Sequence, residues 1–315
     1  MSAVIDLHSH VIAADTRRYP LAPMGGHQSG WARERPVDFE RMIAAMDEAG
    51  VAKSALVQAS TSYTHDNSYV ADAVAAHPKR FTGVFSVDVC AADASERIGY
   101  WMSRGLAGLR VFIAGHTTAA KDVRLDDRRS FPAWETAGRA GIPVCVQLRE
   151  AGLPQLVTVL ERFPRVRVVL DHMARPAIDD GPPYTAAASL FSLARYDNLY
   201  LKLSTHNVRE SHADKATPES FFARVVAEFG ASRIAWGSNF PASEGSLAGL
   251  LAEARSALAA LPQRDRDWIF FRTAQSLYPA LASLEKNRAG RAARPETKSI
   301  IRGVRFFEPR KKEHR

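Results

Sequence analysis

Residues 38–59 read DFERMIAAMDEAGVAKSALVQA, a helical pattern followed at once by a strand pattern. Apolar residues recur every three or four positions in the first half, whereas residues 52–59 form a short, mainly apolar run. Asp38 is a residue type that caps helix N-termini, and Gly50 is the type that ends helices. The stretch predicts a helix over 38–50 that leads directly into a strand over 52–59.

The same alternation of helical and strand patterns runs along the chain. The predicted strands are 3–8, 52–59, 81–88, 107–113, 142–148, 166–172, 199–204 and 233–237. The predicted helices are 38–50, 67–77, 93–104, 131–140, 153–163, 185–195, 218–229, 246–260 and 265–275. Eight βα units joined by right-handed crossovers predict a (β/α)₈ TIM barrel. An open doubly wound sheet is the alternative, although no Gly-x-Gly-x-x-Gly follows the first strand.

The composition predicts a cytoplasmic protein with reduced cysteines and no membrane span. The chain has 315 residues and is 46% hydrophobic, which allows a large buried core. It has no run of about 18 apolar residues, so we expect no membrane partner. The N-terminus already has a strand pattern and not a signal peptide. Cys90 and Cys145 lie far apart, so we expect reduced thiols in a cytoplasmic protein.

The net charge of +8 is concentrated at the C-terminus. Residues 286–315 hold eleven Lys or Arg and three Asp or Glu, so the rest of the chain is neutral. We therefore expect a barrel domain over 1–282, a flexible basic tail over 283–315, and no nucleic-acid partner for the barrel. Apolar helical faces leave a homo-oligomer open.

Polar residues stand near the predicted strand ends, where the active sites of such barrels lie. They are His8, His10, Gln58, Asp88, Arg110, Gln147, His172, Ser204 and Asn239. Asp6, His8 and His10 alternate along the first strand, so we expect all three on one face, where the two imidazoles could hold one ion or one substrate group. Two surface histidines in a loop are the alternative.

His172 and Arg110 have the residue types of a catalytic and a binding group. His172 could act as ligand, acid or base, or as a core histidine bonded to backbone. Asp171, its neighbour, is expected to point outward by alternation. Arg110 suits a substrate carboxylate, or a structural ion pair with Asp88. Lys202 is expected inside the barrel with Ser204, neutralising Asp6 or Asp88.

Two loops add further candidates. Tyr63 lies in the loop 60–67 and could donate a hydrogen bond to substrate. Asn239 lies in RIAWGSNFP, residues 233–241, at the expected mouth of the barrel. The alternative for Asn239 is a turn residue that bonds its own backbone.

Three segments, VIDLHSH, VVLDHMARP and RIAWGSNFP, resemble in this order the amidohydrolase superfamily, in its amidohydrolase-related branch. The resemblance covers about residues 1–282 and is similar to the group with pyrone dicarboxylate hydrolases, sugar-lactone hydrolases and galactarolactone isomerase. It implies a (β/α)₈ barrel that hydrolyses a lactone or a related carboxylate-bearing compound.

The resemblance also implies a site from which this chain departs. In metal-bearing members, histidines of the first, fifth and sometimes sixth strands bind a divalent ion, and an eighth-strand aspartate takes a proton from water. His8, His10 and His172 match three of these histidines. Gln147 stands in the fifth-strand place and Asn239 in the place of the aspartate. An amide has neither charge nor basicity at neutral pH, so we expect no cofactor, with one zinc or manganese ion as the alternative.

These residues lead to a metal-independent lactonase as the expected function. His8, His10, His172 and Asn239 are the expected catalytic residues, and Arg110, Tyr63, Gln147 and Ser204 the expected substrate-binding residues. His172 would direct the attacking water. The alternatives are a lactone isomerase, a metal-dependent hydrolase or decarboxylase with His8, His10 and His172 as metal ligands, and a degenerate barrel that only binds a small acid.

Overall fold

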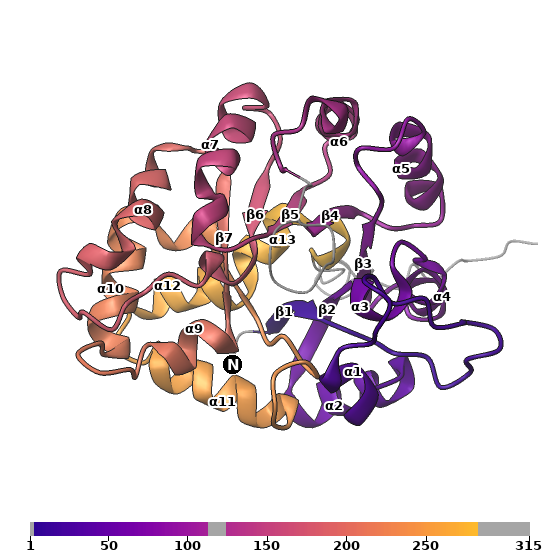
Figure 1. Cartoon of the computed structure of the whole chain (residues 1–315). Coiled ribbons are helices and arrows are strands. Elements are labelled where there is room, and N and C mark those ends of the chain that lie inside the picture. Colours follow the sequence, from indigo (N-terminus) through magenta and orange to yellow (C-terminus); the bar gives the residue numbers. More distant parts are fainter. Residues whose placement is uncertain (1–2, 113–123, 283–315) are drawn as a thin grey trace, which may run out of the picture. The chain divides into compact units, whose positions relative to one another are not determined.

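Eight parallel strands form one sheet in the computed structural model, which describes residues 3–112 and 124–282. The strands are β1 (Val4–Ser9), β2 (Val51–Val57), β3 (Phe81–Ser86), β4 (Gly108–Phe112), β5 (Val144–Gln147), β6 (Val168–Leu170), β7 (Leu199–Ser204) and β8 (Ile234–Gly237). They pair in sequence order, each parallel to the next, with helices around them (Figure 1). The predicted (β/α)₈ barrel is confirmed.

Helices connect successive strands, as predicted. The longer ones are α2 (Phe39–Ala49), α4 (Ser68–Ala76), α5 (Ala94–Ser103), α6 (Phe131–Ala140), α7 (Leu153–Arg162), α10 (Pro218–Phe229) and α11 (Leu247–Ala257). None of the helices in the described part of the chain combines the length and apolar composition that a membrane crossing requires. The predicted basic tail, 283–315, lies outside the described residues.

The first predicted helix has the expected ends. The Asp38 carboxylate accepts a hydrogen bond from the backbone N–H of Arg41, which satisfies one of the unpaired donors of the first turn. Gly50 ends α2 with a φ of 71°, a left-handed conformation that glycine adopts without a steric penalty.

Three segments depart from the predicted pattern. Residues 185–195 form a broken series, with α8 (Ala188–Phe191) between two short 3₁₀ turns. The predicted last helix divides into α12 (Gln263–Asp267), a π-helical turn and α13 (Thr273–Leu277). Short helices α1 (Gly30–Glu34), α3 (Ser60–Tyr63) and α9 (Thr205–Glu210) occur where no helix was expected, because segments of four to six residues contain too little periodicity to detect.

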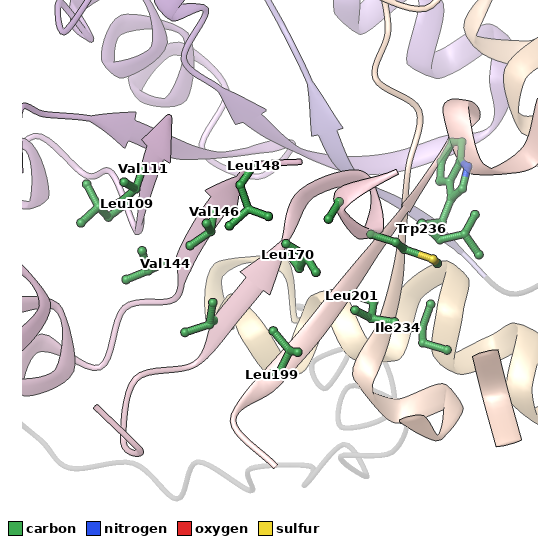
Figure 2. Packing of buried hydrophobic residues seen from close by; sticks show 14 of the residues in the cluster. Leu109, Val111, Val144, Val146, Leu148, Leu170, Leu199, Leu201, Ile234 and Trp236 are labelled. Carbon is green, nitrogen blue, oxygen red and sulfur yellow. The ribbon is translucent and has the colours of Figure 1, made fainter. Parts of the chain in front are cut away.

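The apolar core divides into two clusters according to the alternation of the strands. Leu109 and Val111 of β4, Val144 and Val146 of β5, and Leu199 and Leu201 of β7 belong to the larger cluster, shared with the helices (Figure 2). The smaller cluster contains strand residues that alternate with these, such as Cys145 and Val169, together with residues of α13. The residues between these positions on β4, β5 and β7 are therefore available for the interior of the barrel.

The barrel closes where β8 meets β1. Asn239 donates its backbone N–H to the His8 carbonyl at 2.7 Å, and His10 donates its own to the Phe240 carbonyl at 2.9 Å. A Cβ on Gly237 would lie 2.6 Å from Cβ of His8 and 3.0 Å from its backbone nitrogen. Gly237 therefore permits the close approach of β8 to β1, which holds the backbone of His8 in place.

We predict that Gly237→Ala destabilises the protein by about 1–3 kcal/mol, because the added methyl overlaps the β1 backbone. Gly99→Ala is the matched control, since Gly99 lies within α5 and an added Cβ would contact nothing within 4 Å. That change should be neutral or stabilise by up to about 1 kcal/mol. Urea unfolding measures both free energies, and equal stability of Gly237→Ala and wild type would contradict this account of closure.

Candidate active site

A cavity of about 250 Å³ lies at the carboxyl ends of the strands. Five predicted residues line it: His10, Arg110, Gln147, His172 and Asn239. None of the described residues in its wall is acidic. The cavity therefore combines imidazoles, amides and guanidinium groups, which suits a small anionic or carbonyl-containing molecule.

His8 and His10 meet as the alternation on β1 predicted, with their Nε2 atoms 3.1 Å apart. Nδ1 of His10 lies 2.7 Å from the Val57 carbonyl, so this nitrogen carries the proton. Nε2 of His10 is then the acceptor, and His8 donates to it from its own Nε2. His8 is fully buried behind His10 and does not line the cavity.

Both first-strand histidines are held in the neutral form. Burial, reinforced by the charge of Arg110, lowers the pKa of His10 to about 3. Burial and the charge of Lys202 lower the pKa of His8 well below its ordinary value. These rings accept and donate hydrogen bonds, but they are poor proton acceptors near neutrality.

Asp6 does not share the histidine face, which corrects the expectation from strand alternation. Its carboxylate accepts hydrogen bonds from the backbone N–H of His8, the backbone N–H of Ser238 and the Ser238 hydroxyl. The register of β1 against β2 shifts between Asp6 and Ser9, which breaks the simple alternation. Burial raises the pKa of Asp6 to about 6, although these hydrogen bonds oppose the shift.

Asp171 occupies the centre of the barrel interior, so the prediction that it points outward was wrong. Its Oδ1 lies 2.6 Å from Nζ of Lys202 and its Oδ2 3.0 Å from Nε of Arg110. Burial alone would raise the pKa of Asp171, but these two cations outweigh it and lower the pKa to about 2. The expected partners of Arg110 and Lys202, Asp88 and Asp6, are replaced by this one carboxylate.

A left-handed turn explains why Asp171 and His172 both face inward. Residues 172–175 have φ values of 55°, 54°, 58° and 52°, and none of them is glycine. Such a conformation costs about 1–2 kcal/mol per residue. The Asn207 side chain stabilises the turn by donating to the His172 carbonyl at 2.8 Å. The backbone therefore leaves strand geometry just where the alternation rule was applied.

Ser204 orients His172 and does not itself line the cavity. Its hydroxyl lies 2.8 Å from Nδ1 of His172 and donates to Oδ1 of Asn207 at 3.3 Å. Nδ1 of His172 therefore carries the proton and its Nε2 the lone pair. Burial lowers the pKa of His172 well below its ordinary value, although Asp171 opposes the shift.

Three other predicted residues stand away from the cavity or remain unpaired in it. The Tyr63 hydroxyl accepts a hydrogen bond from the backbone N–H of Ala13 at 2.8 Å, and Tyr63 does not line the cavity. Gln58 donates to carbonyls of the loop that follows β2. Gln147 lines the cavity, and its Oε1 has no hydrogen-bond partner among the described residues.

The cavity wall also contains Trp31, Arg175 and His206, which were not predicted. The Trp31 ring stacks on His10 with centroids 5.3 Å apart. Arg175 pairs with Glu210 through its Nε at 2.7 Å. A weak signal existed for two of them, because His206 closely follows β7 and Arg175 closely follows β6.

Asn239 stands at the mouth end of β8, as predicted. Its φ of 59° is left-handed, which asparagine tolerates better than most residues. The side-chain amide nitrogen donates to the Ser243 hydroxyl at 3.1 Å and lies 3.3 Å from Nε2 of His206. Asn239 therefore both forms the turn after β8 and lines the cavity.

A divalent metal, which the resemblance implies for the metal-bearing members of the family, does not fit the charges of this site. Nitrogens of His8 and His172 and an oxygen of Asp171 lie within 4.8 Å of one another. However, Lys202 and Arg110 already pair with that carboxylate, and the described cavity wall offers no other. A dication would lie beside two fixed cations with neutral imidazoles as its remaining ligands, which is electrostatically unfavourable.

Sequence comparison identifies the family. The amidohydrolase family model matches residues 5–280, so the chain belongs to the amidohydrolase family, a family of enzymes, and the resemblance is confirmed. An L-fucono-1,5-lactonase from Burkholderia ambifaria is 30% identical over 212 residues, which cover 66% of this chain and 70% of the relative.

Solved structures share the fold. A protein from Pseudomonas putida assigned as a 2-pyrone-4,6-dicarboxylic acid hydrolase has a TM-score of 0.71 and 21% identity, covering 89% of this chain and 99% of its own. An amidohydrolase from Burkholderia multivorans with bound zinc has a TM-score of 0.65 and 19% identity, covering 88% and 99%.

We predict that Lys202→Met destabilises the protein by about 3–5 kcal/mol, because it removes one of the two cations that compensate the buried Asp171. Combining it with Asp171→Asn should recover none of the loss, since Arg110 then remains buried without its carboxylate partner. Lys79→Met, at an exposed position, is the control and should be near neutral. Urea unfolding gives the free energies, and a single Lys202→Met variant as stable as wild type would disprove the central role of the ion pair.

Proposed function

We propose that this enzyme opens the ring of a lactone that carries a carboxylate, by attack of water on the ring carbonyl. The observation that carries the proposal is the chemistry of the cavity wall. It presents two guanidinium groups, three imidazoles and two amides, with no carboxylate among its described residues. The lactonase relative and the dicarboxylic acid hydrolase with the same fold support this substrate class.

Arg110 and Arg175 are the proposed anchors of the substrate carboxylate. Asp171 occupies Nε of Arg110, which leaves the two Nη groups of the fork for a bidentate contact. The Arg110 guanidinium also lies over the Phe112 ring at 4.9 Å, which limits its rotation. Glu210 holds Arg175 at the wall of the same cavity.

The remaining wall residues would bind the lactone itself. The Gln147 amide can donate to the carbonyl oxygen, where negative charge develops during attack. Nε2 of His172 can accept a hydrogen bond from a substrate hydroxyl or from the attacking water. Both ring nitrogens of His10 are engaged, so we assign His10 a role in shaping the cavity wall and in packing against the substrate. His8 holds the His10 ring in place through its hydrogen bond.

We further propose that the reaction needs no metal. The Gln147 amide supplies the stabilisation of the developing oxyanion that a Lewis acid would otherwise provide. The unfavourable charge balance described above supports this proposal. The metal alternative would place zinc or manganese on His8, His10 and His172.

A lactone isomerase is a second candidate, and Asn239 is the observation that favours it. A substrate hydroxyl that is already positioned needs less help from a base than water does. A decarboxylase is less favoured, because the family resemblance implies an eighth-strand aspartate for that reaction, whereas this chain has Asn239.

We predict turnover of carboxylated sugar lactones with a kcat/KM about tenfold or more above that of neutral lactones of the same ring size, because each charge-assisted contact contributes about 1.5–3 kcal/mol. A pH-indicator assay detects the acid released, and NMR distinguishes a ring-opened acid from a new lactone. Arg175→Met should reduce the preference for the carboxylated substrate and leave neutral lactones unaffected. Absence of any ring opening across the panel would reject the lactonase, and a new lactone would establish the isomerase.

We predict that chelation leaves this turnover unchanged. Protein purified without affinity metal should contain much less than one zinc, manganese or iron per chain by elemental analysis, because the cations beside Asp171 oppose a dication. Stoichiometric metal together with loss of turnover on chelation, restored by adding back zinc or manganese, would refute metal independence.

A further inference from the structure

Ring opening by water requires a group that takes a proton from the water. None of the described residues of the cavity wall is a carboxylate, and the imidazoles are the candidate bases among them. Three imidazoles line the wall, those of His10, His172 and His206. The one that serves must be able to carry the positive charge that results.

Two of the three are unsuitable. His10 is almost fully buried, lies near Arg110 and already uses both ring nitrogens within the protein. His172 lies near the same cations, and a charge on it would also be adjacent to His206. Each ring would become an imidazolium in a buried site where the one carboxylate, Asp171, is already paired with both Arg110 and Lys202, which is unfavourable.

His206 differs in its position. It lies in the first turn of α9, directly beyond the end of β7, and is only half-buried. The capping box between Ser204 and Asn207 fixes the start of α9 and hence the direction of the ring. The ring also packs edge-on against His172, with centroids 5.3 Å apart.

Asn239 determines which nitrogen of the neutral His206 ring carries the proton. Its amide nitrogen, which can only donate, lies 3.3 Å from Nε2 of His206. Nε2 therefore carries the lone pair. The lone pair of Nε2 points at the side chain of Asn239, just beyond the end of β8. An unprotonated imidazole nitrogen therefore lies beside the amide that stands in the place of the family's eighth-strand aspartate. At 3.3 Å the contact is long enough to yield to a water.

We propose that His206 is the general base of this enzyme, an inference that rests on the proposed lactone hydrolysis. The water oxygen bonds to the lactone carbonyl carbon while Nε2 of His206 takes one water proton, and the carbonyl π electrons become an oxyanion. As the oxyanion collapses, the ring C–O bond breaks. The proton on Nε2 moves to the departing ring oxygen, which gives a hydroxy acid and restores the neutral imidazole.

The test compares His206→Gln with a variant that supplies a carboxylate in its place. His206→Gln should lower kcat by about 10²- to 10⁴-fold and leave KM nearly unchanged. The double variant His206→Gln/Asn239→Asp should regain at least part of the lost kcat, because the carboxylate introduced on β8 then offers a base at the same spot. His212→Gln, an exposed position just beyond α9, is the matched control and should have wild-type kcat.

Each outcome has a definite meaning. If His206→Gln keeps wild-type kcat, His206 is not the base. If kcat falls and the double variant regains none of it, His206 only positions its neighbours, and the proposal is again overturned. Circular dichroism is recorded for every variant, and His206→Asn replaces His206→Gln if the latter does not fold. A wild-type enzyme that opens no lactone refutes the proposed function instead, and that result is separate from any effect at His206.

Discussion

The interior of this barrel is organised around one buried carboxylate. Asp171 lies 2.6 Å from the Lys202 ammonium and 3.0 Å from the Arg110 guanidinium, and all three side chains are buried. Burying such charges is costly unless they are paired, so the three groups constrain the relative positions of β4, β6 and β7. The same pairing fixes Arg110 at the cavity wall and leaves its Nη groups available for an anionic ligand.

The histidines near this ion pair belong to two sets of hydrogen bonds. Val57 orients His10, His10 orients His8, and Ser204 orients His172. Each bond selects a tautomer, because an imidazole held neutral can donate from only one nitrogen. Both ring nitrogens of His10 are thereby engaged within the protein, whereas His172 presents the lone pair of its Nε2 to the cavity. This arrangement separates substrate binding from proton transfer and assigns the latter to the less buried His206.

Much of the fold could be predicted from the sequence because periodicity reflects burial. Three elements have the predicted bounds, since apolar spacing and turn residues define them locally: the strand 199–204 and the helices 131–140 and 218–229. Predictions failed where a non-local contact overrides the local pattern. Asp171 and His172 both face inward because a left-handed turn of four residues begins at His172 and interrupts the alternation there, and Asp6 leaves the histidine face because the register of β1 shifts. No local rule anticipates either departure.

By itself the sequence determined the class of fold and the strands that bear the polar groups, because alternation and hydrophobic spacing are properties of consecutive residues. It also brought His10, Arg110, Gln147, His172 and Asn239 to one cavity, since parallel strands of a barrel end on the same side. Only the tertiary structure decided that Asp171 pairs with Arg110 and Lys202, that Tyr63 and Ser204 support the wall without lining it, and that His206 and Arg175 belong to it. Those assignments depend on distances between separate strands and loops, which the order of residues along the chain does not contain.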